Sequence, residues 1–134
     1  MQLLKTIGLM MIYNRNMHVI KGKVIHGLGN GKKIGLPTCN LDIKDINENI
    51  EYGVYACRVN NKYLGVCNVG NRPTVDNKKT VEVHIIDFDK DIYGETITIE
   101  LLSKLRDIIK FNSLDEVKNQ ILKDINKTKE LYHE

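Results

Sequence analysis

Short apolar runs, separated by glycine, asparagine and aspartate, dominate residues 18–101 and predict β-strands. In the last two runs apolar and polar residues alternate, so that one face of each strand can be buried while the other faces solvent. Several short strands in one domain favour a closed barrel or a sandwich, because both architectures limit exposed strand edges. The first run comprises Val19-Ile20 and Val24-Ile25, and the others are Gly53–Val59, Tyr63–Cys67, Thr80–Ile85 and Thr96–Leu101.

The asparagine pair Asn60-Asn61 separates two of these runs. Asparagine tolerates a positive φ angle, which tight two-residue turns between antiparallel strands require. The pair therefore predicts a β-hairpin between residues 53–59 and 63–67.

The hydrophobic period changes after residue 112 and predicts a helix. Ser113 and Glu116 form a capping box, in which the Ser113 hydroxyl accepts from the amide of Glu116 and the Glu116 carboxylate accepts from the amide of Ser113. Apolar and small residues then recur at three- and four-residue steps, as on a helix face that packs against another layer. They are Leu114, Val117, Ile121, Ile125, Thr128 and Tyr132. The residues thus predict an all-β body with one C-terminal amphipathic helix.

Composition restricts the class of protein. The chain has 134 residues, 42% hydrophobic and 28% charged, enough for one domain that buries a core without a disulfide or metal. Its 20 Lys+Arg and 17 Asp+Glu leave a formal charge of +3, below the basic balance of a dedicated nucleic-acid binder. Cys39, Cys57 and Cys67 contain no C-x-x-C pair and are expected to be reduced, cytosolic thiols.

The first sixteen residues contain an apolar segment that could be mistaken for a signal peptide or a membrane span. An apolar stretch over residues 7–13 follows Lys5, but it ends at Asn14 without a small-residue cleavage site, and it is shorter than the ~18 residues of a membrane span. We therefore expect no signal peptide and no membrane association. Residues 1–16 are interpreted as a lead-in, with an extra strand, a leader and a disordered stretch as open alternatives, and residues 17–134 as the domain.

The segment richest in candidate chemistry runs from Gly27 to Asn40. Glycines 27, 29, 31 and 35 would allow the backbone to approach a ligand and aim its amides at phosphates. The spacing around Lys32 matches neither a P-loop nor a dinucleotide-binding fingerprint. A flexible turn between two strands is the alternative interpretation.

The tetrapeptide Pro37-Thr38-Cys39-Asn40 adds specificity to that segment. In an extended strand, Thr38 and Asn40 project to the same side. A hydroxyl and an amide oxygen side by side suit Mg²⁺, which prefers oxygen ligands and takes few from the protein when phosphates supply others. The alternative is that both side chains only cap a turn.

Three further residues are candidates with equally ordinary alternatives. Glu82 shares the polar face of its strand with Thr80 and His84. It is either an ordinary solvated carboxylate or a general base for an alcohol nucleophile. We interpret His84 as a structural, hydrogen-bonded histidine, since no second metal ligand lies at a suitable spacing. Arg106 follows the last strand and could pair with a phosphate, stack on a ring or be a surface cation.

Several motifs together resemble the riboflavin kinase family, in family order over residues 18–132. No single motif would be specific, but so many matches in register are. The matching segments are Lys23–Gly27, Gly35–Leu41, Gly53–Tyr55, Asn68–Thr74, Val81–Ile85, Asp91–Gly94, Leu105-Arg106 and Lys110–Leu114.

The resemblance implies a mainly β fold, a six-stranded Greek-key closed β-barrel with a C-terminal helix. It implies MgATP-dependent phosphorylation of riboflavin to FMN, a step of flavin biosynthesis, with riboflavin and ATP as the small-molecule partners. Its implied site residues are Glu82 as the catalytic carboxylate, Thr38 and Asn40 as ligands of Mg²⁺ and ATP, Gly27, Gly29, Gly31 and Lys32 over the ATP phosphates, Tyr93 beside the nucleotide, and Arg106 at the flavin.

The sequence departs from the family pattern at two positions. Cys39 replaces the usual alanine, with a side chain expected to point away from Thr38 and Asn40. Lys32 replaces a common arginine, which keeps the charge but loses the bidentate fork, so phosphate affinity should be affected more than activity itself.

Bacterial relatives of this kind usually carry an N-terminal adenylyltransferase half that converts FMN to FAD. No H-x-G-H motif is present and residues 1–16 are too few for such a half, so we expect no FAD synthesis. We also expect a cytoplasmic monomer that binds neither membrane nor nucleic acid, since aromatics are only 6% of the residues and are scattered. A non-catalytic flavin- or nucleotide-binding barrel is the alternative function.

Overall fold

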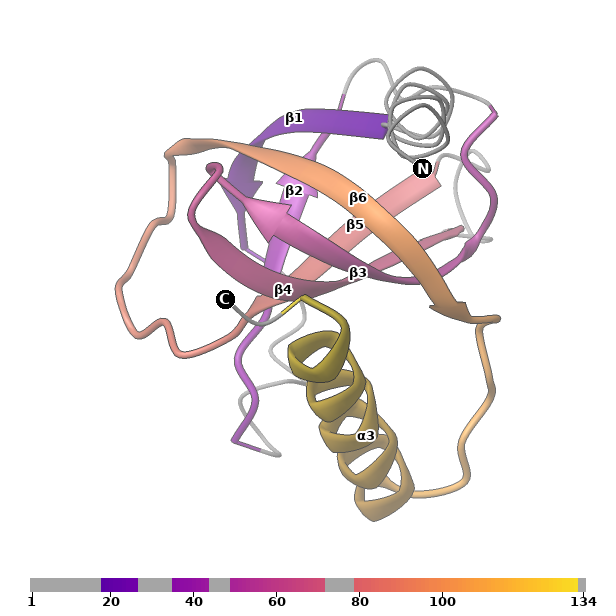
Figure 1. The fold of residues 1–134 in the computed structure, drawn as a ribbon. Helices are drawn as coiled ribbons and strands as arrows, with labels where there is room; N and C mark the ends of the chain where they lie inside the picture. Colours follow the sequence, from indigo (N-terminus) through magenta and orange to yellow (C-terminus); the bar gives the residue numbers. More distant parts are fainter. Residues whose placement is uncertain (1–17, 27–34, 44–48, 72–78, 133–134) are drawn as a thin grey trace.

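The computed structural model describes residues 18–26, 35–43, 49–71 and 79–132, which form six β-strands and one long helix (Figure 1). The elements in chain order are β1 (His18–Ile25), β2 (Cys39–Asp42), β3 (Gly53–Val59), β4 (Tyr63–Asn71), β5 (Lys79–Ile85), β6 (Thr96–Arg106) and α3 (Leu114–Tyr132). The strands predicted from the apolar runs and the predicted helix are confirmed, whereas β2 is not among those runs.

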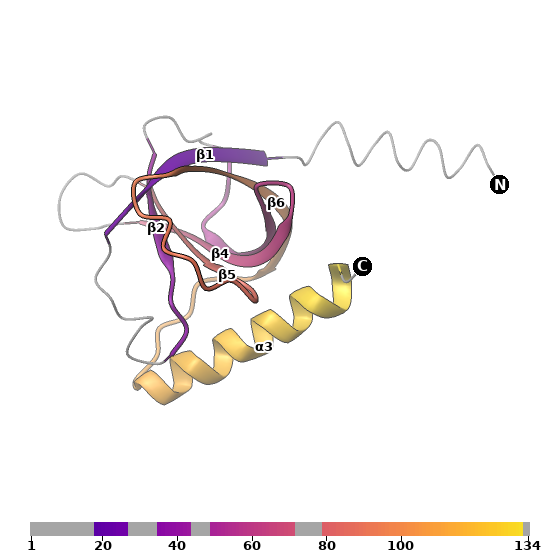
Figure 2. The same ribbon diagram turned by 90° about the vertical axis from the view of Figure 1, so that its left-hand side faces the viewer.

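The six strands close into an antiparallel barrel in the order β1-β2-β5-β4-β3-β6. β1 pairs with both β2 and β6, and this double pairing closes the barrel that Figure 2 shows from its open end. The barrel expected from the resemblance is therefore confirmed, and of the two architectures that the strand pattern allowed, the sandwich is excluded.

Alternation along the strands divides each of them between the core and the outer surface. On β5, Val81, Val83 and Ile85 are buried inside the barrel, while the residues between them face outward and are half-buried. The same alternation on β1 and β6 fills the interior with aliphatic side chains. The fully buried members with the largest side chains are Ile97, Ile99, Val59, Val69, Val81 and Val83.

The hairpin between β3 and β4 forms at the predicted place. Asn60 and Asn61 have φ angles of 50° and 60°, in the left-handed region that asparagine tolerates better than most residues. The amide of Lys62 donates to the carbonyl of Val59 at 3.0 Å and closes the turn.

The helix α3 lies along the outside of the barrel, against β4 and β3 (Figures 1 and 2). Ile125 and the half-buried Ile121 pack on a second apolar cluster on the outer barrel surface. That cluster consists of Val54, Val66, Ile86, Leu36 and Leu64. The predicted stripe is wrong at its first position, because Leu114 is 50% exposed in the turn before the helix reaches the barrel.

The predicted capping box is half correct. The amide of Glu116 donates to the Ser113 hydroxyl at 3.2 Å, as expected. The Glu116 carboxylate, however, accepts from the amide of Asn112 at 2.8 Å and not from that of Ser113. The carboxylate therefore caps one residue further upstream and fixes the segment that leads into α3.

The structure bears on the cysteines and on membrane-spanning helices, but not on the N-terminal lead-in or on most of the glycine-rich segment. Cys39, Cys57 and Cys67 are all free thiols, as predicted. Among the described residues, no helix is long and apolar enough to cross a membrane. The lead-in 1–16 lies outside the described residues, as do residues 27–34 of the glycine-rich segment.

Candidate functional site

A direct hydrogen bond joins two of the predicted site residues that lie 44 positions apart in the sequence. The Thr38 hydroxyl donates to Oε1 of Glu82 at 2.9 Å. On the adjoining strand, Asn40 is directly opposite Glu82 in the β2–β5 ladder. The structure therefore brings Thr38, Asn40 and Glu82 together on the outer face of the barrel.

Strand alternation explains this arrangement. Cys39 and Leu41 pack toward the barrel core, so Asn40 between them faces outward. Paired residues in an antiparallel ladder share a face, which places Glu82 on the same surface. The prediction that Thr38 and Asn40 project to the same side agrees with this geometry, because both lie next to Glu82.

His84 fixes the segment that precedes β2. Its Nδ1 lies 2.8 Å from the carbonyl oxygen of Pro37, and since a carbonyl only accepts, Nδ1 donates this bond. His84 is thus a hydrogen-bonded structural histidine, as interpreted from the sequence. By tying Pro37 to β5, it fixes the residue next to Thr38.

A cavity of about 500 Å³ adjoins Thr38 and Asn40. Its walls come from the end of β1, from residues 37–40 and from the connection between β5 and β6. Tyr93 lines it and stacks on His26, with ring centroids 3.8 Å apart and planes 14° apart. Glu82 is not among the lining residues, so Thr38 and Asn40 lie between this cavity and the carboxylate.

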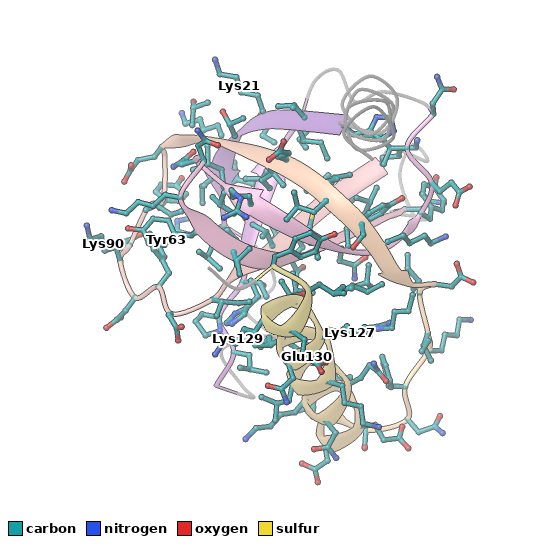
Figure 3. All side chains as sticks on the ribbon, viewed as in Figure 1. Lys21, Tyr63, Lys90, Lys127, Lys129 and Glu130 are labelled. Carbon is teal, nitrogen blue, oxygen red and sulfur yellow. The ribbon has the colours of Figure 1, made fainter. Side chains whose placement is uncertain are left out.

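The connection between β5 and β6, residues 86–95, forms one wall of the cavity and is held to the barrel near each of its ends. Val24 and Glu95 are joined by a backbone hydrogen bond of 2.8 Å, and the amide of Gly94 donates to the carbonyl of Val24 at 2.9 Å. Further along, Phe88 packs edge-on against Tyr63 of β4 with centroids 4.9 Å apart. Figure 3 shows Tyr63 on the side of the barrel where Lys90, from the same connection, extends into solvent.

Cys39 lines the cavity with a protonated thiol. Burial, and to a lesser degree the negative charges of Asp91 and Glu82, raise the pKa of Cys39 above its ordinary value. A thiolate is the form that binds metals and attacks electrophiles. At neutral pH, the thiol of Cys39 is therefore a poor ligand for a cation.

The donor set around Thr38 fits Mg²⁺. Thr38 and Asn40 offer one hydroxyl and one amide oxygen, and Glu82 adds a carboxylate nearby. Within the described ranges there is no cluster of three or more His, Cys, Asp or Glu side chains that could hold a metal without other ligands. A cation at this site would consequently need phosphate oxygens or water to complete its coordination.

Arg106 is held in a bidentate ion pair, away from the cavity. Its Nε and Nη2 donate to the two carboxylate oxygens of Asp124 on α3, at 3.1 and 2.9 Å. The guanidinium carbon lies 5.9 Å from the centre of the Phe111 ring. Arg106 thus has a structural partner, which the sequence interpretation did not foresee.

The remaining predicted residues, Gly27, Gly29, Gly31 and Lys32, lie outside the described residues. The sequence reasoning assigned no role to His26 or Asp124. His26 carried a weak signal, as the polar residue that ends the first strand before the glycines. Asp124 carried a clearer one, since it is a carboxylate next to Ile125 on the apolar side of the helix.

These features define the class of protein as a closed antiparallel barrel with an oxygen-rich site beside a ligand-sized cavity. The family model described as riboflavin kinase (flavokinase) matches residues 14–132. The chain belongs to the riboflavin kinase family.

Individual relatives are similar over most of this chain. It is 42% identical over 113 residues to the RNA-binding riboflavin kinase RibR of Bacillus subtilis, covering 82% of this chain and 49% of that protein. It is 40% identical over 119 residues to the bifunctional riboflavin kinase/FMN adenylyltransferase of Haemophilus influenzae, covering 85% of this chain and 38% of that protein. The chain therefore spans less than half the length of these curated relatives.

A solved structure supports the same assignment. The crystal structure of riboflavin kinase from Trypanosoma brucei superimposes with a TM-score of 0.61 at 25% sequence identity. The match covers 88% of this chain and 81% of that chain.

Proposed function

We propose that this chain transfers the γ-phosphate of MgATP to the ribityl 5′-hydroxyl of riboflavin, giving FMN and ADP. The observation that carries the proposal is the 2.9 Å contact between Thr38 and Glu82, with Asn40 directly opposite Glu82. Phosphoryl transfer to an alcohol needs oxygen ligands for the metal–phosphate group next to a proton acceptor, and this arrangement offers both.

In the proposed reaction, the 5′-oxygen of riboflavin attacks the γ-phosphorus in line, its proton passes to Glu82, and the bond from the γ-phosphorus to the bridging oxygen breaks to release ADP. Thr38 and Asn40, which line the cavity, would hold the metal–phosphate group. Bound Mg²⁺ supplies neutralisation of the phosphate charge.

The cavity beside Thr38 is the proposed nucleotide site, in which the stacked rings of His26 and Tyr93 offer an apolar surface to the base. Gly27, Gly29, Gly31 and Lys32 are proposed to cover the phosphates. Arg106, whose charge is already paired with Asp124, is proposed to contact the flavin ring through its planar guanidinium face.

The deciding experiment incubates the purified chain with riboflavin, ATP and Mg²⁺ and separates the flavins by chromatography. FMN should form, and should not form when ATP is omitted or Mg²⁺ is chelated. Riboflavin binding without FMN formation would instead support a non-catalytic binding module. FAD formation from FMN and ATP would contradict the expectation that the chain makes FMN alone.

We further propose that the chain acts in the cytoplasm as a monomer on small molecules, without a nucleic-acid partner. The three free thiols support the cytoplasm, and the modest charge of +3 supports the absence of a nucleic-acid partner. Since the relative from Bacillus subtilis is named as RNA-binding, a mobility-shift assay with single-stranded RNA is the direct test. Steeply salt-dependent binding would overturn the proposed absence of a nucleic-acid partner.

A further inference from the structure

A second asparagine flanks Glu82 on the side opposite Asn40. Asn68 of β4 is directly opposite Glu82 in the β4–β5 ladder, just as Asn40 is in the β2–β5 ladder. Directly opposed residues in an antiparallel ladder have Cα atoms about 5 Å apart and share a face. Asn40, Glu82 and Asn68 therefore form one row across three strands on the outer surface of the barrel.

The Asn68 side chain is available to a ligand. It is exposed, and it makes no hydrogen bond or ion pair with another residue of the described ranges. Its neighbours in the sequence, Cys67 and Val69, are fully buried in the core, so the strand cannot slip and the amide is held facing outward.

Gly70 lies two residues beyond Asn68 on β4 and on the same face of the strand, and it is buried. A Cβ atom placed on Gly70 would lie 3.5 Å from Asn68 Oδ1, 3.5 Å from Ile108 Cδ1 and 3.6 Å from Thr80 Oγ1. These three side chains therefore surround and cover Gly70. Because Gly70 pairs with Thr80, it marks the next outward-facing pair along the ladder from Asn68 and Glu82.

We propose that Asn68 is a substrate-positioning residue, whose amide binds a secondary hydroxyl of the ribityl chain while the 5′-hydroxyl lies at Glu82. This inference rests on the proposed function. The nucleotide cavity lies on the β2 side of Glu82, and the acceptor is proposed to approach from the β4 side, where the exposed Asn68 lies. The 4′- and 3′-hydroxyls are the proposed partners of Asn68, because they are the secondary hydroxyls nearest to the 5′ position.

The test compares wild type, Asn68→Ala and the control Asn126→Ala, an exposed asparagine on α3. With riboflavin, Asn68→Ala should lower kcat/KM by about three- to tenfold, the scale of one hydrogen bond, and leave KM for ATP unchanged. The control should match wild type. An unchanged kcat/KM for riboflavin in Asn68→Ala would overturn the inference.

Acceptor analogues separate positioning from a general structural effect. With 3′-deoxyriboflavin or 4′-deoxyriboflavin, whichever lacks the bound hydroxyl, Asn68→Ala and wild type should turn over equally, because the interaction is already missing. A defect of the variant that persists with both analogues would overturn the inference. If wild type makes no FMN from riboflavin, the proposed function fails and this inference with it.

Gly70→Ala gives a second, independent variant. The added methyl group makes only ordinary contacts, so the protein should fold, but its carbon lies 3.5 Å from Asn68 Oδ1 and restricts access to that oxygen. KM for riboflavin should rise while the unfolding midpoint stays close to that of wild type. An unchanged KM for riboflavin in a folded variant would contradict binding of the acceptor at Asn68 Oδ1.

Discussion

Arg106 at the end of β6 and Asp124 in the middle of α3 form a two-pronged ion pair with side chains only 17% and 5% exposed. Gln120 donates a further hydrogen bond of 3.1 Å to the same carboxylate. The pair connects the last strand of the barrel to the helix. It also gives a proposed flavin-contacting residue a fixed orientation.

Removing Asp124 should destabilise the fold. In Asp124→Ala the Arg106 guanidinium loses its buried partner, and we expect the free energy of unfolding to fall by about 2–4 kcal/mol, measured by urea denaturation. Asp107→Ala is the matched control, because that carboxylate pairs with Lys104 while remaining 87% exposed. The control should unfold near the wild-type midpoint. Equal midpoints for both variants would show that the Arg106–Asp124 pair stabilises the fold no more than an exposed ion pair does.

Replacing the proposed base should reduce turnover with little effect on binding. Glu82→Gln keeps an oxygen that can accept from Thr38 but cannot take up a proton, so kcat should fall by roughly 10²–10⁴, the usual scale of general-base catalysis. Riboflavin affinity, followed by flavin fluorescence, should be largely unchanged. Glu100→Gln, on the strand across the barrel, should behave as wild type. A Glu82→Gln enzyme with normal turnover would eliminate the assignment.

The two proposed metal-site residues should affect the Mg²⁺ requirement. Thr38→Ala and Asn40→Ala each remove one oxygen from the edge of the cavity, so both should shift the Mg²⁺ titration of activity to higher concentration and raise KM for ATP. KM for riboflavin should change less. Mg²⁺ titrations that superimpose on wild type would count against a metal role.

Cys39 should be the one native-state labelling site among the three cysteines. Cys57 and Cys67 are fully buried, whereas Cys39 is half-buried on the cavity wall. Because burial and nearby carboxylates raise its pKa, the thiolate fraction at neutral pH is below that of an ordinary thiol, and alkylation by iodoacetamide should accelerate only at alkaline pH.

Two comparisons test that assignment. Saturating MgATP should slow the alkylation of Cys39, since the proposed nucleotide fills the cavity that the thiol lines. Cys39→Ala should abolish native-state labelling and remain active, because the side chain packs inward and does not face Thr38 or Asn40. Rapid labelling at neutral pH would contradict the raised pKa.

Local patterns predicted the elements because each signal is carried by neighbouring residues. Alternation gave the orientation of Val81 and Val83, and the asparagine pair gave the turn at Asn60. Leu114 misled because helix periodicity shows which residues share a face but not where along the helix the barrel ends.

The contacts among the proposed site residues could not be predicted from the sequence. Thr38 and Glu82 are 44 positions apart, and only the β2–β5 register decides that they touch. Asn68 was visible as part of a motif, but its place beside Glu82 follows from a ladder between distant segments. The Arg106–Asp124 pair likewise depends on where α3 docks, which no local pattern specifies.

Closure of the barrel has a consequence for how the molecule opens. Each of the six described strands has a hydrogen-bonded neighbour on both sides, so none of them can detach without breaking two ladders. Amide hydrogen exchange in β1 and β6 should therefore be as slow as in β4, with no fast-exchanging border strand of the kind an open sheet would have. Asn40, Glu82 and Arg106 thus lie on strands that should exchange together, as one cooperative unit.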